Sequence, residues 1–490
     1  MKKLAALCAT FLLGGCTLGP DFVPPQADTA PGYTGPGDSA LTGEQNLALG
    51  KQADSEWWKQ FQSEALNDLI AKAGFGNRDI AAARARLRQS QEYVRAAEGA
   101  LLPQVSLGAA IGEQNYSVGL RTPLSVTLPN FTYYAVAPTV SYPLDLFGGA
   151  KRSVERDAAF AEYQKYELEA VTLSLFANIA SQALQNAGAR AQIANLEDIV
   201  KGDERNVALV QSAMDSGSAT RTQLLSVQSQ LSSDRTLLPD FRQQEAVSRH
   251  ALAVLAGQAP GSWTMPELAL EGFSLPKEIP AAFPSDLIHQ RPDILAAEAE
   301  LHMASAAIGI ATANLYPQIT LSATLTRQAL SPDSLFSSSP NIWNIAAGLT
   351  QPLFNGGALS AQRRAAIAAY QAALADYEKV VLASFGQVAD NLQALANDAE
   401  KVAAEKDAEE TSAAALDLAR RSYAVGNSGI LDVIDAERRY AEAKLGSSRA
   451  AEQRLLHTVQ LYVSLGGAKV PASGGDAEPE SASAKPCCTY

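Results

Sequence analysis

The chain contains two copies of one structural unit, and this duplication constrains its fold more than any other feature. Residues 80–107 align with residues 294–321 without a gap, and Pro103 matches Pro317 within that alignment. Two further landmarks recur in the same order, displaced by roughly two hundred residues: Leu146-Phe147-Gly148-Gly149 with Leu353-Phe354-Asn355-Gly356-Gly357, and Gly217 with Gly426. Each copy reads as helix, strand, loop, strand, long helix, glycine-containing turn and helix. We therefore expect an internally duplicated fold.

The N-terminus reads as an export signal followed by a lipid attachment site. Two lysines precede an apolar run over residues 4–13, which is too short to span a bilayer as a helix. The run ends in Leu13-Gly14-Gly15-Cys16, which resembles the lipobox of bacterial lipoproteins. We expect a signal peptide over residues 1–15 and a covalent lipid on Cys16. The alternative is an ordinary signal peptide that happens to contain a cysteine.

The residue after that cysteine bears on the compartment. It is Thr17 and not an aspartate, which by resemblance to bacterial lipoproteins favours sorting to the outer membrane. A single acyl chain binds a membrane weakly, so the lipid is expected to be an accessory anchor. Beyond Cys16, the mature chain has only Cys487 and Cys488 near its end. No disulfide can therefore hold the body of the protein together.

Composition excludes several classes of protein. The formal net charge is -13 with only 39 Lys and Arg residues, and no basic cluster is present, so nucleic acid is not an expected partner. The four histidines stand alone, without a second ligand at metal-site spacing. Neither GxSxG nor HExxH occurs. We expect no enzymatic activity, and no cofactor other than the lipid on Cys16.

Two long proline-free stretches predict very long helices. Residues 144–238 and 353–470 contain no proline and are rich in Ala, Leu, Gln, Glu and Arg. Apolar residues recur there at the three- and four-residue spacing of a coiled coil: Ile367, Tyr370, Leu374, Tyr377, Val381, Phe385 and Val388. A helix over residues 356–425 would be on the order of 100 Å long, which exceeds what a compact domain needs.

Four segments of alternating residues interrupt the helices, two in each copy. They cover residues 105–111, 134–142, 319–325 and 343–350. Apolar residues on one face and small or polar residues on the other are typical of membrane β-strands with a wet interior; the alternative is soluble hairpins packed on the helices. Four strands cannot close a membrane barrel, and lipid does not tolerate an open sheet edge. The barrel is therefore expected to be shared, with eight strands from two chains or twelve from three.

Two motifs carry a resemblance to a known family. They are Trp57-Trp58-Lys59-Gln60-Phe61 and the joining segment FPSDLIHQRPDI over residues 283–294. The chain resembles the TolC-type outer-membrane efflux factors, and the joining segment is similar to the signature of their lipoprotein branch, sometimes called NodT-like. The resemblance runs from Cys16 to about Gly467. It implies a homotrimeric α+β membrane protein, in which a twelve-stranded β-barrel continues into a long periplasmic α-helical barrel.

The same resemblance divides the chain into segments. A mixed α/β belt is expected partway down the helices, and the last segment, rich in Ser, Ala, Gly and Glu, is expected to be disordered. The expected segments are 1–15 (signal peptide), 16–60 (lipidated segment and part of the belt), 61–256 (first repeat), 257–285 (linker in the belt), 286–467 (second repeat) and 468–490 (tail).

The function implied by the resemblance is that of a passive exit duct. The protein would span the outer membrane, extend into the periplasm and conduct small molecules such as drugs outward. Its partners would be outer-membrane lipid, a periplasmic adaptor and an inner-membrane transporter, most simply of the resistance-nodulation-division type. Two alternatives are a duct for type I protein secretion and a periplasmic coiled-coil lipoprotein scaffold without a pore.

The candidate site residues lie at the helix turns. Asp432 and Asp435 are three apart and share a helix face, and the resemblance implies that such carboxylates ring the periplasmic entrance. The alternative is that both simply favour the first turns of a helix. Tyr423 matches a family tyrosine that links neighbouring helices, but Gln223 and Ser428 stand where the family has an acidic residue and an arginine. The residues expected to dock the adaptor are Gly217, Ser218, Gly426, Asn427 and Gly429.

Overall fold

The computed structural model describes residues 17–26, 32–38, 41, 45–51, 54–115, 130–337 and 341–467. The expected signal peptide, the lipidated Cys16 and the expected tail over 468–490 lie outside these residues, as does most of the loop at 114–130. The chain divides into two compact units. Unit 1 takes Met1–Gln26, Ala85–Lys165 and Ala296–Glu378, and unit 2 takes Ala27–Arg84, Tyr166–Leu295 and Lys379–Tyr490.

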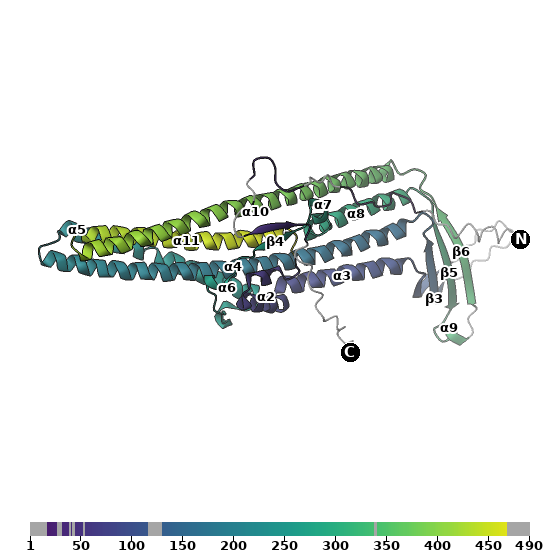
Figure 1. Ribbon diagram of the computed structural model, residues 1–490. Coiled ribbons are helices and arrows are strands. Elements are labelled where there is room, and N and C mark those ends of the chain that lie inside the picture. Colours follow the sequence, from purple (N-terminus) through teal and green to yellow (C-terminus); the bar gives the residue numbers. More distant parts are fainter. Residues whose placement is uncertain are drawn as a thin grey trace, which may run out of the picture. The chain divides into compact units, whose positions relative to one another are not determined.

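Unit 1 contains one antiparallel sheet of four strands within the described residues. In chain order the strands are β2 (Gln104–Gln114), β3 (Phe131–Leu144), β5 (Gln318–Ala329) and β6 (Asn341–Thr350). They pair in the order β2-β3-β5-β6 (Figure 1). Each strand covers one of the alternating segments, so the prediction of two strands per repeat is confirmed. The short helix α9 (Ser334–Ser337) follows β5.

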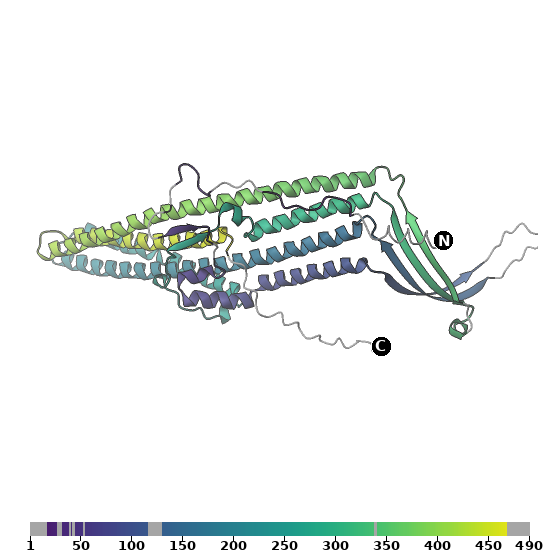
Figure 2. The same cartoon turned by 45° about the vertical axis from the view of Figure 1, so that its right-hand side comes forward.

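The sheet has two free edges, β2 and β6, in the single chain. Large apolar side chains on both edge strands are exposed to a degree that a soluble sheet would not tolerate. They are Val105, Leu107 and Ile111 on β2, and Ile342, Trp343, Ile345 and Leu349 on β6. Figure 2 shows the four strands from a second side, where the sheet is visibly curved. Exposed edges and curvature are what a strand set needs when other chains complete a barrel.

Long helices contribute residues to both units. They are α3 (Arg78–Ala100), α4 (Gly149–Asp215), α8 (Pro292–Ala313) and α10 (Ala358–Ala424). The bounds of α10 agree with the helix expected over residues 356–425. It begins directly after Gly356 and Gly357, which both have positive φ and so end the extended chain that precedes the helix.

Unit 2 holds the remaining elements. The short ones are η1 (Trp57–Phe61), η2 (Pro260–Ser262), η3 (Leu270–Gly272), α7 (Pro284–Leu287), and the parallel strand pair β1 (Asn46–Leu49) and β4 (Glu278–Ala281). The longer helices are α2 (Glu64–Gly76), α5 (Arg221–Arg235), α6 (Leu238–Leu255) and α11 (Ile430–Ser464). Strands β1 and β4 come from the two segments expected to form the belt, and they pair in parallel.

Both family motifs have structural roles in unit 2. Trp57 and Phe61 are fully buried on η1, and Trp57 stacks on the buried Tyr462 of α11 with 5.5 Å between ring centroids. Arg291, at the end of the joining segment, is almost fully buried. Its guanidinium donates to the Ser464 carbonyl at 2.8 Å and to Gln387 Oε1 at 2.8 Å. It thus holds the C-terminus of α11 against α10, because unpaired carbonyls at a helix end accept cationic donors.

The last helix of the first repeat differs from the single helix we expect. It is divided into α5 and α6 by a turn at Thr236 and Leu237. Pro239 lies at the start of α6, where its ring is tolerated and where it cannot donate the hydrogen bond that would continue α5. The equivalent α11 of the second repeat is unbroken.

Candidate functional site

The two turns at the ends of the long helices share one backbone motif. After α4, Gly217 N–H donates to Met214 O and Ser218 N–H to Ala213 O, at 2.9 and 2.8 Å. After α10, Gly426 N–H and Asn427 N–H make the corresponding pair of bonds, each at 2.9 Å. Both glycines have positive φ, +80° and +76°, as this type of helix ending requires. The duplicated glycines of the sequence therefore close equivalent turns.

A small apolar cluster holds the two turns together. Val210 of α4 and Leu224 and Val227 of α5 are buried, and Ile430 and Ile434 of α11 pack against them. The first hairpin, α4–α5, is thereby in contact with the start of α11 (Figures 1 and 2). All of the expected docking residues lie on these two turns.

The two candidate gate aspartates both have local partners in the single chain. Asp432 Oδ2 accepts from the Gly429 backbone N–H at 2.9 Å, which caps the start of α11. Asp435 Oδ2 pairs with Arg439 one helical turn further on, at 2.8 Å. The Asp435 side chain nevertheless stays 57% exposed, so an ion in solution can reach it.

Gln223 and Tyr423, the other two candidate gate residues, have separate surroundings in the single chain. Gln223 Oε1 accepts from the Thr220 N–H at 2.7 Å, and the Thr220 hydroxyl caps Gln223 N–H in return. Gln223 therefore completes a capping box at the start of α5. Tyr423 is 44% exposed, and Ser428 Oγ is buried without a hydrogen-bond partner.

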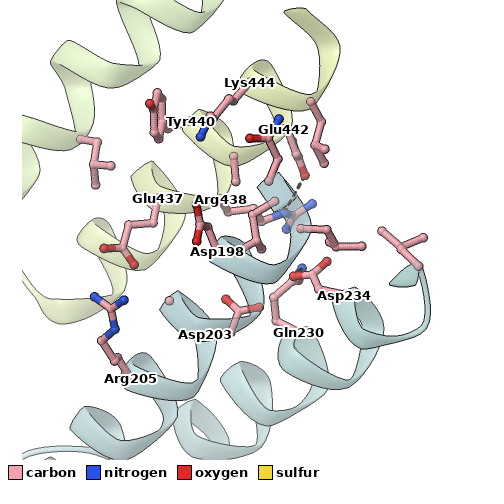
Figure 3. A pocket seen from close by; sticks show the side chains of 18 of the residues that line it. Asp198, Asp203, Arg205, Gln230, Asp234, Glu437, Arg438, Tyr440, Glu442 and Lys444 are labelled. Carbon is pink, nitrogen blue, oxygen red and sulfur yellow. Dashed lines mark hydrogen bonds and ion pairs between the residues drawn. The ribbon is translucent and has the colours of Figure 1, made fainter. Parts of the chain in front are cut away.

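A polar pocket of about 450 Å³ lies between α4, α5, α10 and α11 (Figure 3). Asp203 of α4 and Asp234 of α5 meet there, with Glu437 of α11 nearby. Burial raises the pKa of Asp203 to about 7, and its hydrogen bond to the Asp234 carboxyl and the charges of Asp234 and Glu437 act in the same direction. The raised pKa favours the protonated form of Asp203, which can donate its proton to the Asp234 carboxylate on the other arm of the first hairpin.

Glu437 connects the first hairpin to the second. Its Oε2 accepts from Asn206 of α4 at 2.8 Å, and its Oε1 accepts from Arg420 of α10 at 2.7 Å. The cluster of Asp203, Asp234 and Glu437 could not be predicted from the sequence, because its members are far apart in the chain and charged residues on long helices usually face solvent.

A second buried carboxyl lies further along α11. Glu452 is only 7% exposed and packs against Gly188 of α4, where any side chain would collide with the carboxylate. Gln192 donates to Glu452 at 3.0 Å and accepts from Arg449 at 3.2 Å. Burial raises the pKa of Glu452 to about 7, against the opposing effects of Gln192 and the Arg449 charge.

In unit 1, the segment directly after Cys16 is clamped onto α4 and α8. The buried Arg152 of α4 donates to Leu18 O at 3.2 Å and pairs with Asp21 at 2.7 Å. Phe22 stacks on His302 of α8 with ring centroids 4.4 Å apart. We call residues 17–22 the N-terminal strap. The partners of the strap could not be predicted from the sequence, because no pattern in the residues around Arg152 indicates that this arginine is buried.

Across the ranges that the structure describes, no group of three or more His, Cys, Asp or Glu residues has an arrangement that could hold a metal ion.

Comparison with known proteins gives consistent matches. The model of the family described as outer membrane efflux protein matches residues 69–258 and 283–467. The chain is 29% identical over 478 residues to the pyoverdine export outer membrane protein OpmQ of Pseudomonas aeruginosa, covering 95% of this chain and 97% of OpmQ. It is 27% identical to nodulation protein T of Rhizobium leguminosarum bv. viciae, covering 99% and 96%. Among solved structures, the outer-membrane channel OprN matches with a TM-score of 0.85 and 27% identity, covering 93% of this chain and all of OprN.

Proposed function

The chain belongs to the outer membrane efflux protein family, and from that premise we propose how it assembles, is gated and finds its partners. The protein is the outer-membrane channel of an efflux pump and no enzyme. In our proposal, three copies close a twelve-stranded barrel, and their helices continue as an α-barrel into the periplasm. The observation that carries the proposal is the sheet with two exposed edges, which lipid does not tolerate in a single chain.

The assembly is tested on the full-length protein in mild detergent. Analytical ultracentrifugation should give a mass of three chains at all protein concentrations that can be measured. A folded, membrane-inserted monomer, or a dimer with eight strands, would contradict the proposal. The scaffold alternative predicts a protein that leaves the membrane once its lipid is removed.

The gate belongs to the same proposal. Asp432 and Asp435 of three copies would form a ring of carboxylates at the periplasmic end, with Tyr423 and Gln223 beside it. The exposure of the Asp435 side chain supports a role in attracting cations. Replacing both aspartates by alanine should weaken block by multivalent cations in single-channel recordings and lower cation preference.

The partners follow from the position of the turns. The periplasmic adaptor would dock on the two turns, with an inner-membrane transporter below it. A photoreactive residue at Ser218 or Asn427 should cross-link the adaptor in cells, whereas one at the exposed Glu410 of α10 should not. If the adaptor cross-linked only at Glu410, its docking surface would lie along α10 and not on the two turns.

Small molecules are the proposed cargo. Support comes from OpmQ, which is named for pyoverdine export and matches nearly the whole chain. Deleting the protein should raise the cellular content of small efflux substrates and leave protein secretion unchanged. Loss of a secreted protein, with normal small-molecule content, would instead favour the type I secretion alternative.

A further inference from the structure

The cavity between α4, α5, α10 and α11 has both apolar and acidic walls (Figure 3). Leu196 of α4, Leu416 of α10 and Leu445 of α11 line it, and all three are buried. Asp203 of α4 and Asp234 of α5 lie at the same cavity. Its volume of about 450 Å³ is within the range of roughly 300–1,000 Å³ that is typical of sites for small organic molecules. The cavity therefore has the size and the mixed lining of a ligand site.

Gly202 keeps part of this lining free of side chains. It lies in the interior of α4, where a glycine destabilises the helix relative to most other residues. Close packing explains the glycine at position 188 of the same helix, where a side chain would collide with the carboxylate of Glu452. At Gly202, by contrast, no described atom lies within 4 Å of an added Cβ. The space beside Gly202 is open, and a ligand can fill it.

The carboxylates at the cavity differ in whether a basic side chain pairs with them. Three of them are paired: Asp198 with Lys201, Glu437 with Arg420, and Glu442 with Arg438. Asp203 and Asp234 form no ion pair among the described residues, and only Gln230 donates to Asp234 from its own helix, at 2.8 Å. Asp203 Oδ2 is buried and has no hydrogen-bond partner there. Because a buried acceptor without a donor is costly, this oxygen favours a ligand that brings an N–H group.

The basic side chains at the cavity have other surroundings. They are Arg205, Arg420, Arg438, Lys444 and Arg449. Arg420 and Arg438 belong to the ion pairs above, and Arg449 has a polar and an aromatic partner. Arg205 is exposed to solvent, and Lys444 is half-buried. The buried polar atom that lacks a partner at this cavity is thus an acidic oxygen, within the part of the chain that the structure describes.

We propose that the cavity binds an amphipathic organic cation, with its charged nitrogen against Asp203 and Asp234 and its apolar body beside Gly202 and the buried leucines. A metal ion fits less well, because no group of three or more metal-ligating side chains is formed by the described residues and the apolar walls supply no ligand. The site lies within one chain, so the inference does not depend on how many copies assemble.

Binding of a cation is expected to replace the proton on Asp203. Burial, the hydrogen bond to Asp234 and the charges of Asp234 and Glu437 raise the pKa of Asp203 to about 7, and a positive charge beside this carboxyl favours its ionised form instead. The ligand would then contact both arms of the first hairpin and hold α5 against α4 at a pH at which Asp203 and Asp234 otherwise repel.

Ethidium is a suitable probe, because it is a planar cation with N–H donors whose charge does not change between pH 6 and pH 8. Its fluorescence anisotropy is titrated with the full-length protein in mild detergent. All samples carry Asp432→Asn and Asp435→Asn, which remove binding at the proposed carboxylate ring. We expect one molecule bound per chain, with an affinity about tenfold higher at pH 8 than at pH 6, since the ionised fraction of Asp203 rises by that factor.

Two kinds of variant separate the charge of the site from its space. Asp203→Asn should abolish the pH dependence, and adding Asp234→Asn should weaken binding at pH 8 by about tenfold or more, as expected for a lost charged partner. Glu410→Gln, at an exposed acid outside the cavity, is the charge control and should bind normally. Gly202→Leu keeps both carboxylates but fills the space and should abolish binding. Gly386→Leu, at a glycine of α10 with equally open surroundings, should not.

The fold of each variant is checked by thermal unfolding, and Gly202→Leu should melt no lower than the unmodified protein because leucine favours a helix more than glycine does. At pH 8, ethidium should raise the amide protection factors of α5 in the unmodified protein and leave those of Gly202→Leu unchanged. Ethidium binding that survives Gly202→Leu, or that is equally tight without the two aspartates, overturns the site. Binding of the anion 1-anilinonaphthalene-8-sulfonate in place of ethidium, with its loss in Lys444→Gln, overturns the proposed class of ligand.

Discussion

At the scale of single residues, Asp432 combines two roles that substitutions can separate. Its carboxylate caps the start of α11 through the Gly429 N–H, and it is also half of the proposed carboxylate ring. An asparagine keeps an oxygen acceptor for the cap but removes the charge, while an alanine removes both. The two substitutions therefore distinguish a helix-start residue from a gate residue.

We predict that Asp432→Asn weakens block by multivalent cations while leaving the melting temperature near that of the unmodified protein. Asp432→Ala should weaken the block equally and also cost on the order of 1 kcal/mol of stability through the lost hydrogen bond. Single-channel recordings and thermal unfolding measure the two effects. Unchanged cation block in both variants would leave Asp432 as a helix cap alone.

The raised pKa of Asp203 predicts that the packing of α5 on α4 depends on pH. Its pKa rises from 3.8 to about 7 on folding, so the folded state binds the proton more tightly than the unfolded state. The stabilisation is therefore fully present below about pH 4 and is lost as pH rises through about 7, when Asp203 and Asp234 repel. Glu452 has a raised pKa of about 7 and contributes in the same direction.

We predict that the amide protection factors in α5, which are exchange rates corrected for their intrinsic pH dependence, are lower at pH 8 than at pH 6, and that Asp203→Asn removes much of this difference. The amide of asparagine still donates to Asp234 but does not titrate. Asp198→Asn, at an exposed residue beside Lys201, is the control and should keep the difference. Equal protection factors at the two pH values in the unmodified protein would contradict the proton-sharing interpretation.

At the scale of elements, the N-terminal strap depends on one buried arginine. Arg152 donates to two strap carbonyls and pairs with Asp21 and Glu155. The guanidinium is buried, whereas the Asp21 carboxylate is 90% exposed and is solvated when the arginine is removed. The loss therefore falls on the hydrogen bonds that hold the strap. The strap has few other polar anchors, so the loss should act locally.

Arg152→Gln should therefore release residues 17–22, seen as faster amide exchange and new protease cleavage in the strap, while the helices keep their protection. Arg156→Gln is the matched control, since that arginine lies one turn further along α4, has a side chain that is 47% exposed, and pairs with Asp157 and not with the strap. A strap that stays protected in Arg152→Gln would show that the Phe22–His302 stack is sufficient.

Elements with a local signal could be predicted from the sequence, and those formed by distant residues could not. Alternation of apolar with small or polar residues over about ten positions predicted β2, β3, β5 and β6. Long stretches without proline predicted α4 and α10. The break between α5 and α6 was missed because Pro239 was read as the end of a stretch and not as an interruption. The Asp203–Asp234 pair and the Arg152 clamp join elements that meet only in the folded chain.

At the scale of the whole molecule, two membrane attachments are proposed, and their contributions can be separated. We predict that Cys16→Ser abolishes labelling with palmitate but leaves part of the protein in the outer membrane, since the barrel is the main anchor. Fractionation of membranes and periplasm measures how much of the protein stays in the outer membrane and how much is released. Complete release into the soluble periplasm would contradict a spanning barrel.

The N-terminal strap also determines an order of events during biosynthesis. Arg152 belongs to the first repeat, whereas His302 and Gly309, against which the strap also packs, belong to the second. Synthesis runs from the N-terminus at about 5–20 residues per second, so the strap emerges tens of seconds before its second set of partners. The first part of the mature protein to be made is thus among the last to reach its native contacts.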